Sequence, residues 1–170
     1  MSPIGHFSVG LAAKRAAPQV PLGILLFATL VIDFLWFFFF SIGIENNSER
    51  IEFSYIPWSH GLVMAIVWSI LAGIIAFFIY KDRRTSIVIG LVVFSHWVLD
   101  FIGHDPDLPL FFDNTYLVGL GLEWTHTPTG LVVHYAQGLI LEFGLFIVGF
   151  IIYWRARKQL ALRTRGHLKE

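Results

Sequence analysis

Cysteine is absent from the 170 residues, and charged residues make up only 14% of the chain. Without thiols there is neither a disulfide framework nor a thiolate metal site, so a metal ion would need nitrogen and oxygen ligands. The formal net charge is zero, which argues against a nucleic-acid groove as the main purpose. Hydrophobic residues reach 56%, which is more apolar side chain than one small soluble core can hide. The composition therefore predicts a protein whose solvent is a lipid bilayer.

Long apolar runs separate the short charged blocks, and four of them can cross a hydrocarbon core of about 30 Å, which takes about 20 helical residues. We expect an all-α polytopic membrane protein, a single domain built as a four-helix transmembrane bundle. The apolar segment before Lys14 is too short to cross and is expected to form a short amphipathic helix or a re-entrant one. The predicted spans cover about 21–43, 58–80, 85–103 and 130–154, with a long outer loop at 104–129 and a basic tail at 155–170.

Lys and Arg are unevenly distributed between the two sides of the predicted bundle. One side carries Lys14, Arg15, the Lys81–Arg84 turn and the basic tail, whereas the connections on the other side are acidic. Because cytoplasmic loops carry an excess of Lys and Arg, this pattern predicts that both termini are cytoplasmic. We expect a multi-pass protein of the cell membrane, of a bacterial inner membrane.

Polar residues with ligand chemistry gather in the outer half of the predicted bundle. His96, Asp100 and His104 are spaced four residues apart and line one helical face. Counting about 1.5 Å per residue places Asp33 of the first span and His60 of the second at similar heights. A carboxylate near the bilayer centre costs about 2.5 to 3.5 kcal/mol on insertion scales, so such groups should face the bundle and have partners.

Imidazoles together with two or more carboxylates form a suitable site for zinc or manganese. We therefore predict a divalent metal, with zinc preferred, and His6 can take part only if the N-terminal segment re-enters the membrane. A catalytic proton acceptor is expected among Asp33, Asp100 and Glu142. The candidate metal ligands are His6, Asp33, His60, His96, Asp100 and His104.

Other readings of these residues remain open. His96 and Asp100 can simply hydrogen-bond each other and fasten helices together, as polar residues in membrane bundles often do. His104 lies at the predicted interface, where water can solvate it. Glu142 on the fourth span can be a general base, a ligand or an interhelical hydrogen-bond partner.

Four stretches of the sequence resemble the YdjM-like family of inner-membrane, membrane-bound metal-dependent hydrolases. The family elements are an N-terminal His, an acid in the first span, a Ser or Thr followed by His, and a Ser-His with Asp four residues later. The resemblance implies that these elements are His6, Asp33, His60, and His96 with Asp100. It also implies a distant similarity to zinc-dependent phospholipase C and thus phosphoester hydrolysis. The stretches are HFSVGLAAK (6–14), residues 20–36, PWSHGL (57–62) and SHWVLDFIGHDPDLPL (95–110).

These observations predict a membrane-embedded hydrolase acting on a lipid-like phosphoester at the outer membrane face, with membrane lipid as its surroundings. One alternative is a non-catalytic membrane subunit whose cluster is a structural metal or a polar staple. Ion or proton transport is a third class, but it needs a polar route through both leaflets. The inner halves of the predicted spans contain almost nothing ionisable.

Overall fold

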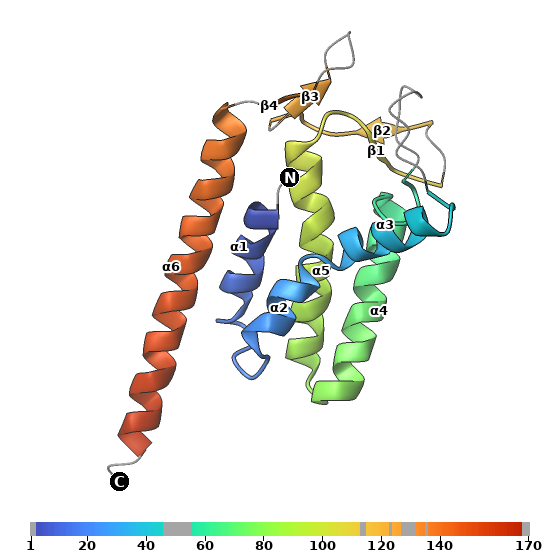
Figure 1. The fold of residues 1–170 in the computed structure, drawn as a ribbon. Coiled ribbons are helices and arrows are strands. Elements are labelled where there is room, and N and C mark those ends of the chain that lie inside the picture. The colour runs from blue at the N-terminus through green and yellow to red at the C-terminus, as the bar shows by residue number, and fades with distance from the viewer. Residues whose placement is uncertain are drawn as a thin grey trace.

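The computed structural model describes residues 3–45, 56–112, 115–122, 124–126, 132–134 and 136–167, with side chains described outside 124–126, 132–134 and 163–167. This part of the chain is mostly helical (Figure 1). By length and composition, α4, α5 and α6 can each cross a membrane, and the bent pair of α2 and α3 makes a fourth span if counted as one. The helices are α1 (Pro3–Ala13), α2 (Leu22–Ala28), α3 (Val31–Ser41), α4 (Leu62–Tyr80), α5 (Arg83–Gly103) and α6 (Ala136–His167).

The helices α4 and α5 form a hairpin joined by Lys81 and Asp82. Lys81 has a φ of 53°, in the left-handed region that ends a helix, and Asp82 caps α5 by accepting a 2.8 Å hydrogen bond from the Thr85 N–H. The hydrogen bonds from Thr85 lower the pKa of the Asp82 carboxyl. A Cβ at Gly90 would lie 2.9 Å from the Ser69 carbonyl oxygen, so glycine is what lets the two backbones approach. The result is a closely packed helix pair. Its helix α5 carries His96 and Asp100, and His60 lies in the turn before α4.

The predicted span at 21–43 is not one continuous helix, because α2 and α3 meet at a bend of 53°. The break falls at Thr29 and Leu30, and the Thr29 hydroxyl donates a 2.7 Å hydrogen bond to the Leu26 carbonyl. Non-helical backbone at membrane depth is tolerated when protein surrounds it, and Thr29 is fully buried. No proline or glycine lies at the break, so the local sequence does not predict it.

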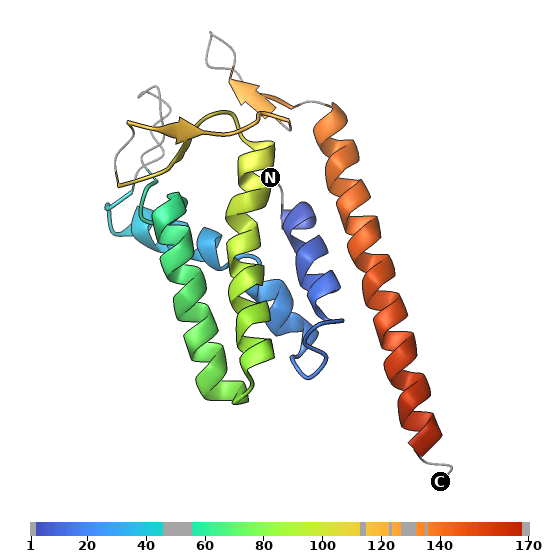
Figure 2. The same ribbon diagram turned by 180° about the vertical axis from the view of Figure 1, so that it is seen from behind.

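The N-terminal helix α1 lies beside α5 and α6 within the bundle rather than on its surface (Figures 1 and 2). His6 and Ser8 are buried, and a Cβ at Gly149 of α6 would collide with the Ser8 carbonyl oxygen. The structure therefore places this segment inside the helix bundle, and its course as an amphipathic or a re-entrant helix at a membrane stays a prediction. The beginning of α1 and the end of α6 lie at opposite heights (Figure 1), and the cytoplasmic placement of both termini stays a prediction.

The connection between α5 and α6, predicted as the long outer loop, contains short antiparallel hairpins, which the all-α expectation did not include. Strand β1 (Leu108–Pro109) pairs with β2 (Leu117–Val118), and β3 (Trp124–His126) pairs with β4 (Val132–His134). Both hairpins lie at the same end of the bundle (Figures 1 and 2). The last helix starts at Ala136 rather than near 130 and continues through most of the predicted basic tail, of which residues 168–170 lie outside the described part.

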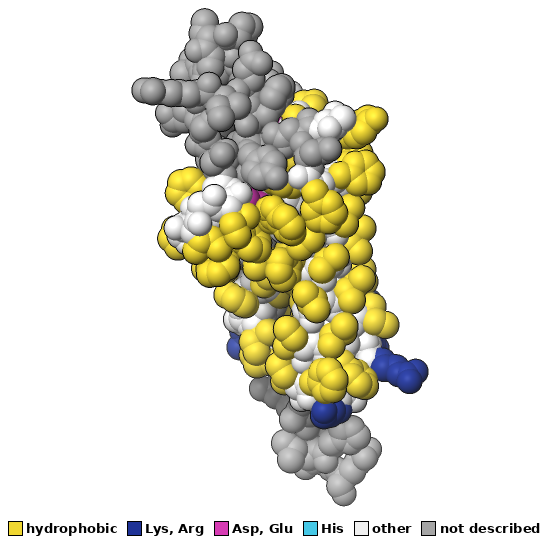
Figure 3. All heavy atoms as spheres, turned by 90° about the vertical axis from the view of Figure 1, so that its right-hand side faces the viewer, with side chains coloured by type: hydrophobic (Ala, Val, Ile, Leu, Met, Phe, Trp, Pro, Cys, Tyr) yellow, Lys and Arg dark blue, Asp and Glu magenta, His cyan; other side chains and the backbone are white. Residues whose placement is uncertain are grey.

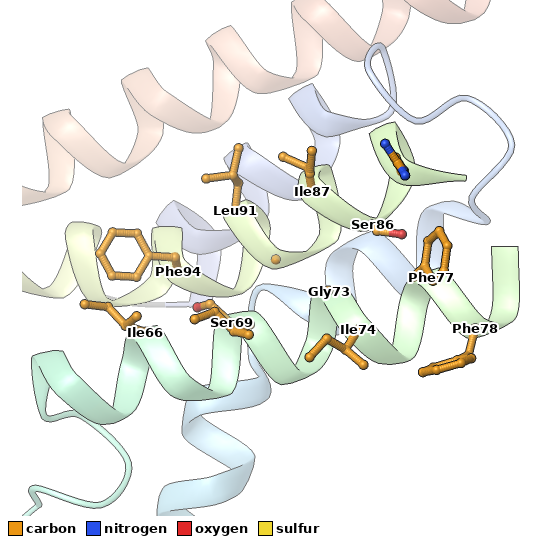
Figure 4. A pocket seen from close by; sticks show the side chains of 13 residues that line it. Ile66, Ser69, Gly73, Ile74, Phe77, Phe78, Ser86, Ile87, Leu91 and Phe94 are labelled. Carbon is orange, nitrogen blue, oxygen red and sulfur yellow. The ribbon is translucent and has the colours of Figure 1, made fainter. Parts of the chain in front are cut away.

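A broad apolar surface covers α3 and α4, with Lys and Arg at its lower end (Figure 3). An open groove of about 670 Å³ follows the seam between α4 and α5 (Figure 4). Its only polar lining residues are Ser69, Ser86 and Arg83. This surface has the apolar character of a lipid-facing wall, and Arg83 is the one ionisable residue among those that line the groove.

Candidate metal centre

Five of the residues singled out from the sequence converge in one place. They come from α1 (His6), the first turn of α3 (Asp33), the turn before α4 (His60) and α5 (His96 and Asp100). Donor atoms of His6, His96 and Asp100 all lie within 4.8 Å of one another, and so do those of Asp33, His60 and His96. His96 belongs to both groups, so the five side chains form one unit, called here the histidine–aspartate cluster.

Each imidazole of the cluster faces a carboxylate through its Nε2 atom. His96 Nε2 lies 3.0 Å from Asp100 Oδ2 and 3.4 Å from Asp33 Oδ1. His60 Nε2 lies 3.6 Å and 3.7 Å from the same two oxygens, and His6 Nε2 lies 3.3 Å from Asp100 Oδ1. Metal–nitrogen bonds of about 2.0 to 2.1 Å at zinc imply a tetrahedral edge of about 3.3 Å between ligand atoms. The separations within each donor group therefore match the spacing of atoms that share a metal ion.

The cluster is closed on most sides and open at one. His6, His96 and Asp100 are at most 2% exposed, and His60 is 7% exposed. The Asp33 side chain, in contrast, is 44% exposed. Asp33 is followed on α3 by the exposed side chains of Phe34, Phe37 and Phe38. The open side of the cluster therefore borders an apolar surface.

The orientation of His96 is set by the break between α2 and α3. His96 Nδ1 lies 2.7 Å from the Thr29 carbonyl oxygen, and since a carbonyl only accepts, Nδ1 must carry a proton and donate it. In a neutral ring, Nε2 is then a lone pair directed at the Asp33 and Asp100 oxygens. Nε2 has no hydrogen-bond partner among the described residues. Acceptors this close repel unless a cation lies between them, and that cation can be a metal ion or a second proton on the ring.

His104 and Glu142 belong to neither donor group found among the described residues. His104 lies next to the cluster, with Nε2 3.5 Å from Asp100 Oδ1 and Nδ1 3.3 Å from Asp107 Oδ1. Glu142 is 3% exposed on α6, the helix that packs against α1. Their predicted roles, as a ligand and as a proton acceptor, stay predictions.

Sequence reasoning missed two side chains that support the cluster, Glu45 and Ser59. Glu45 is 1% exposed and accepts hydrogen bonds from the backbone of Trp58 and from Ser59, whose hydroxyl also lies 2.9 Å from His60 Nδ1. Burial raises the pKa of the Glu45 carboxyl, because removal from water penalises its charged form. The Ser-His pair in the sequence was the available signal for Ser59. Nothing local marks Glu45, which lies in an acidic connection with similar neighbours.

The main-chain oxygen of Thr29 is a third feature that no sequence pattern reveals, since any residue could provide it.

Comparison of the chain with protein-family models, with curated proteins and with solved structures found no match. What can be said of this site therefore comes from its own geometry, which is that of a buried His and Asp group able to hold a metal ion.

Proposed function

We propose that the histidine–aspartate cluster binds a divalent metal ion and that the protein is a membrane-embedded hydrolase of lipid-like phosphoesters at the outer membrane face. Zinc is the expected metal, and manganese is the alternative. The observation that carries the proposal is the convergence of three imidazoles and two carboxylates from four parts of the chain, with Nε2 of each imidazole turned to the carboxylates.

The donor set fits a divalent cation in charge as well as in spacing. Two ionised carboxylates and three neutral imidazoles carry a formal charge of −2, which one such ion balances. Nitrogen and oxygen donors of this kind suit zinc and manganese. His96 Nε2 is buried and lacks a hydrogen-bond partner among the described residues, which supports a further ligand beside it.

The two carboxylates have different surroundings and receive different roles in this proposal. Asp100 is 2% exposed and lies close to the Nε2 atoms of His6, His60 and His96, so it holds the imidazoles in place. Asp33 is the carboxylate on the open side, with its side chain 44% exposed, and we assign its carboxylate the acceptance of a proton. A bound divalent ion supplies water activation and stabilises the negative charge that develops in phosphoester hydrolysis.

A lipid-like substrate is favoured by the surface around the opening. The exposed phenylalanines of α3 follow Asp33, so an approaching molecule meets apolar side chains before it reaches the carboxylate. A freely soluble phosphoester gains nothing from such a surface, whereas an acyl chain does.

The test begins with metal content. Protein purified in detergent and incubated with zinc is expected to retain it stoichiometrically, whereas His96→Ala is not. Asp82→Asn is the matched control, because it removes a carboxylate at the other end of α5.

Activity is then measured on short-chain lipid phosphoesters and on their soluble headgroup analogues. We expect zinc-dependent hydrolysis of the lipid forms, lost in Asp33→Asn.

One alternative has a specific observation in its favour. A second proton on His96 would also remove the repulsion between its Nε2 lone pair and the oxygens of Asp33 and Asp100. His96 would then be a polar staple between helices in a non-catalytic subunit. Wild-type protein that takes up neither zinc nor manganese, yet loses thermal stability in His96→Ala, would establish the staple and refute the metal site. Metal binding without hydrolysis of any lipid phosphoester would leave the metal site and refute the hydrolase.

A further inference from the structure

A chain of hydrogen bonds leads from a buried carboxylate outside the cluster to the far side of His60. Glu45 Oε1 accepts from the Trp58 and Ser59 backbone N–H groups, both at 2.8 Å. Glu45 Oε2 accepts from the Ser59 hydroxyl at 2.7 Å, and the Ser59 oxygen lies 2.9 Å from His60 Nδ1. Glu45, Ser59 and His60 are all buried, so water does not compete for these bonds.

The direction of each bond in this chain follows from proton counting. Three donors point at the two oxygens of Glu45, and these hydrogen bonds favour the ionised carboxylate against the burial that raises its pKa. Ser59 has one hydroxyl proton and gives it to Glu45, so its oxygen has only lone pairs left for His60. His60 Nδ1 must therefore carry a proton and donate it to Ser59.

The consequence for the cluster is a choice of tautomer. A neutral imidazole with its proton on Nδ1 has a lone pair on Nε2, and His60 Nε2 is the atom that lies near Asp33 and Asp100. Liganding histidines in metal sites commonly donate their other N–H to an oxygen in this way, which fixes both the ring orientation and the tautomer.

We propose that Glu45 is a positioning residue of the metal site, acting through Ser59 to hold His60 as the Nδ1–H tautomer with Nε2 ready to bind a metal ion. The inference rests on the metal binding proposed above but concerns the protein before any metal arrives. A Cβ at Gly61 would collide with the Pro57 carbonyl oxygen, so the residue after His60 has no room for a side chain.

The sequence contains a second Ser-His pair, Ser95–His96, that provides a matched comparison. The Ser95 hydroxyl donates to the Val92 carbonyl of its own helix at 2.7 Å, and His96 Nδ1 uses the Thr29 carbonyl instead. The serine of the dipeptide thus contacts the histidine ring at Ser59–His60 and does not hydrogen-bond to it at Ser95–His96. Ser95→Ala is therefore the control for Ser59→Ala.

The experiment measures the tautomer and the metal affinity separately. Metal-free protein with ¹⁵N-labelled histidine in detergent micelles is examined by NMR, with His60→Gln used to assign the His60 signals. Zinc affinity is measured by competition with a chromophoric chelator. In wild-type protein we expect the His60 proton on Nδ1. In Ser59→Ala we expect a shift towards Nε2–H and a loss of zinc affinity of about 10- to 100-fold.

Two further variants separate hydrogen-bond direction from packing. Ser59→Thr keeps the hydroxyl and is expected to restore both readouts. Glu45→Gln keeps the shape, but its amide NH₂ donates to the Ser59 oxygen, so the hydroxyl turns to donate to His60 Nδ1. We therefore expect Glu45→Gln to reverse the tautomer and to weaken zinc binding about as much as Ser59→Ala, while Ser95→Ala behaves as wild type.

The possible outcomes distinguish this inference from the proposed function. If wild-type protein binds no metal but shows the Nδ1–H tautomer, and Glu45→Gln reverses it, the proposed metal site fails, and Glu45 is left as the residue that sets the tautomer of His60. If wild-type protein binds zinc but His60 carries its proton on Nε2, or Glu45→Gln changes neither tautomer nor affinity, the positioning role is overturned.

Discussion

Replacing Gly149 by leucine probes whether α1 belongs to the metal site. Gly149 lies on α6 where any Cβ would collide with the Ser8 carbonyl oxygen, so a leucine has to push α1 away from α6. His6 lies two residues before Ser8 on α1 and contacts Asp100 at 3.3 Å. A displacement of α1 should therefore withdraw one imidazole from the cluster.

The size of the effect follows from the cost of forcing a side chain into a packed contact, about 1 to 3 kcal/mol. If that cost opposes only the state in which α1 is docked, the apparent zinc affinity falls by about 5- to 150-fold. Gly144→Leu is the matched control on the same helix, since a Cβ at Gly144 meets nothing within 4 Å. Its zinc affinity should stay within about twofold of wild type, as for a substitution away from packing contacts.

The assay is zinc competition in detergent, with thermal unfolding of the zinc-free protein measured in parallel. His6→Ala and the double variant with Gly149→Leu complete a cycle, and the two changes are expected to be strongly non-additive because both remove the same ligand. Equal zinc affinities for Gly149→Leu and Gly144→Leu would refute the reasoning that the α1–α6 contact holds His6 in the site. Full additivity in the cycle would instead show that Gly149→Leu lowers the zinc affinity by a route that does not involve His6.

Three further predictions concern the carboxylates and the metal. Asp100→Asn is expected to weaken zinc binding more than Asp33→Asn, as competition titrations will report. Asp100 lies near four imidazole Nε2 atoms, three of them in the cluster, whereas Asp33 lies near two. Removing zinc with a chelator should lower the thermal unfolding temperature. Zinc at 100 times its Kd should add about 2.7 kcal/mol to the free energy of unfolding of the zinc-free protein, whereas magnesium should not. The pKa of Asp82 is lowered in the folded state, so its contribution to stability is complete above its unfolded pKa of about 3.9 and is lost as the pH falls through the folded value. Thermal unfolding between pH 5 and pH 3 should therefore show a smaller loss of stability in Asp82→Asn than in wild type, and parallel curves would contradict it.

The height of the polar residues could be predicted from the sequence because helical rise is constant. His96 and Asp100 lie on an unbroken α5, and counting residues from the turn at Asp82 was enough to level them with Asp33 and His60. The same counting could not foresee the bend at Thr29 and Leu30. Its partner is His96, 67 positions away, and the contact uses a main-chain oxygen that any residue possesses.

The support behind His60 was hidden for a different reason. Ser59 and Ser95 precede a histidine in the same way, and only the fold decides which hydroxyl reaches the ring. Glu45 lies 14 positions before Ser59 and bonds to its backbone and side chain, a pairing that depends on how the chain returns after α3. The small hairpins after α5 were likewise missed, since strands of two or three residues carry no periodic signal.

The position of α1 has a consequence for the order in which the protein is made. His6 is translated before its partner Asp100 on α5, and α6, which contacts α1 at Ser8, follows α5 in the chain. A nascent chain arrested between α5 and α6 would hold α4 and α5 as a finished hairpin while α1 lacked its outer wall. For the metal site proposed above, loading would then follow the synthesis of α6, and chains truncated before α6 would carry an incomplete centre.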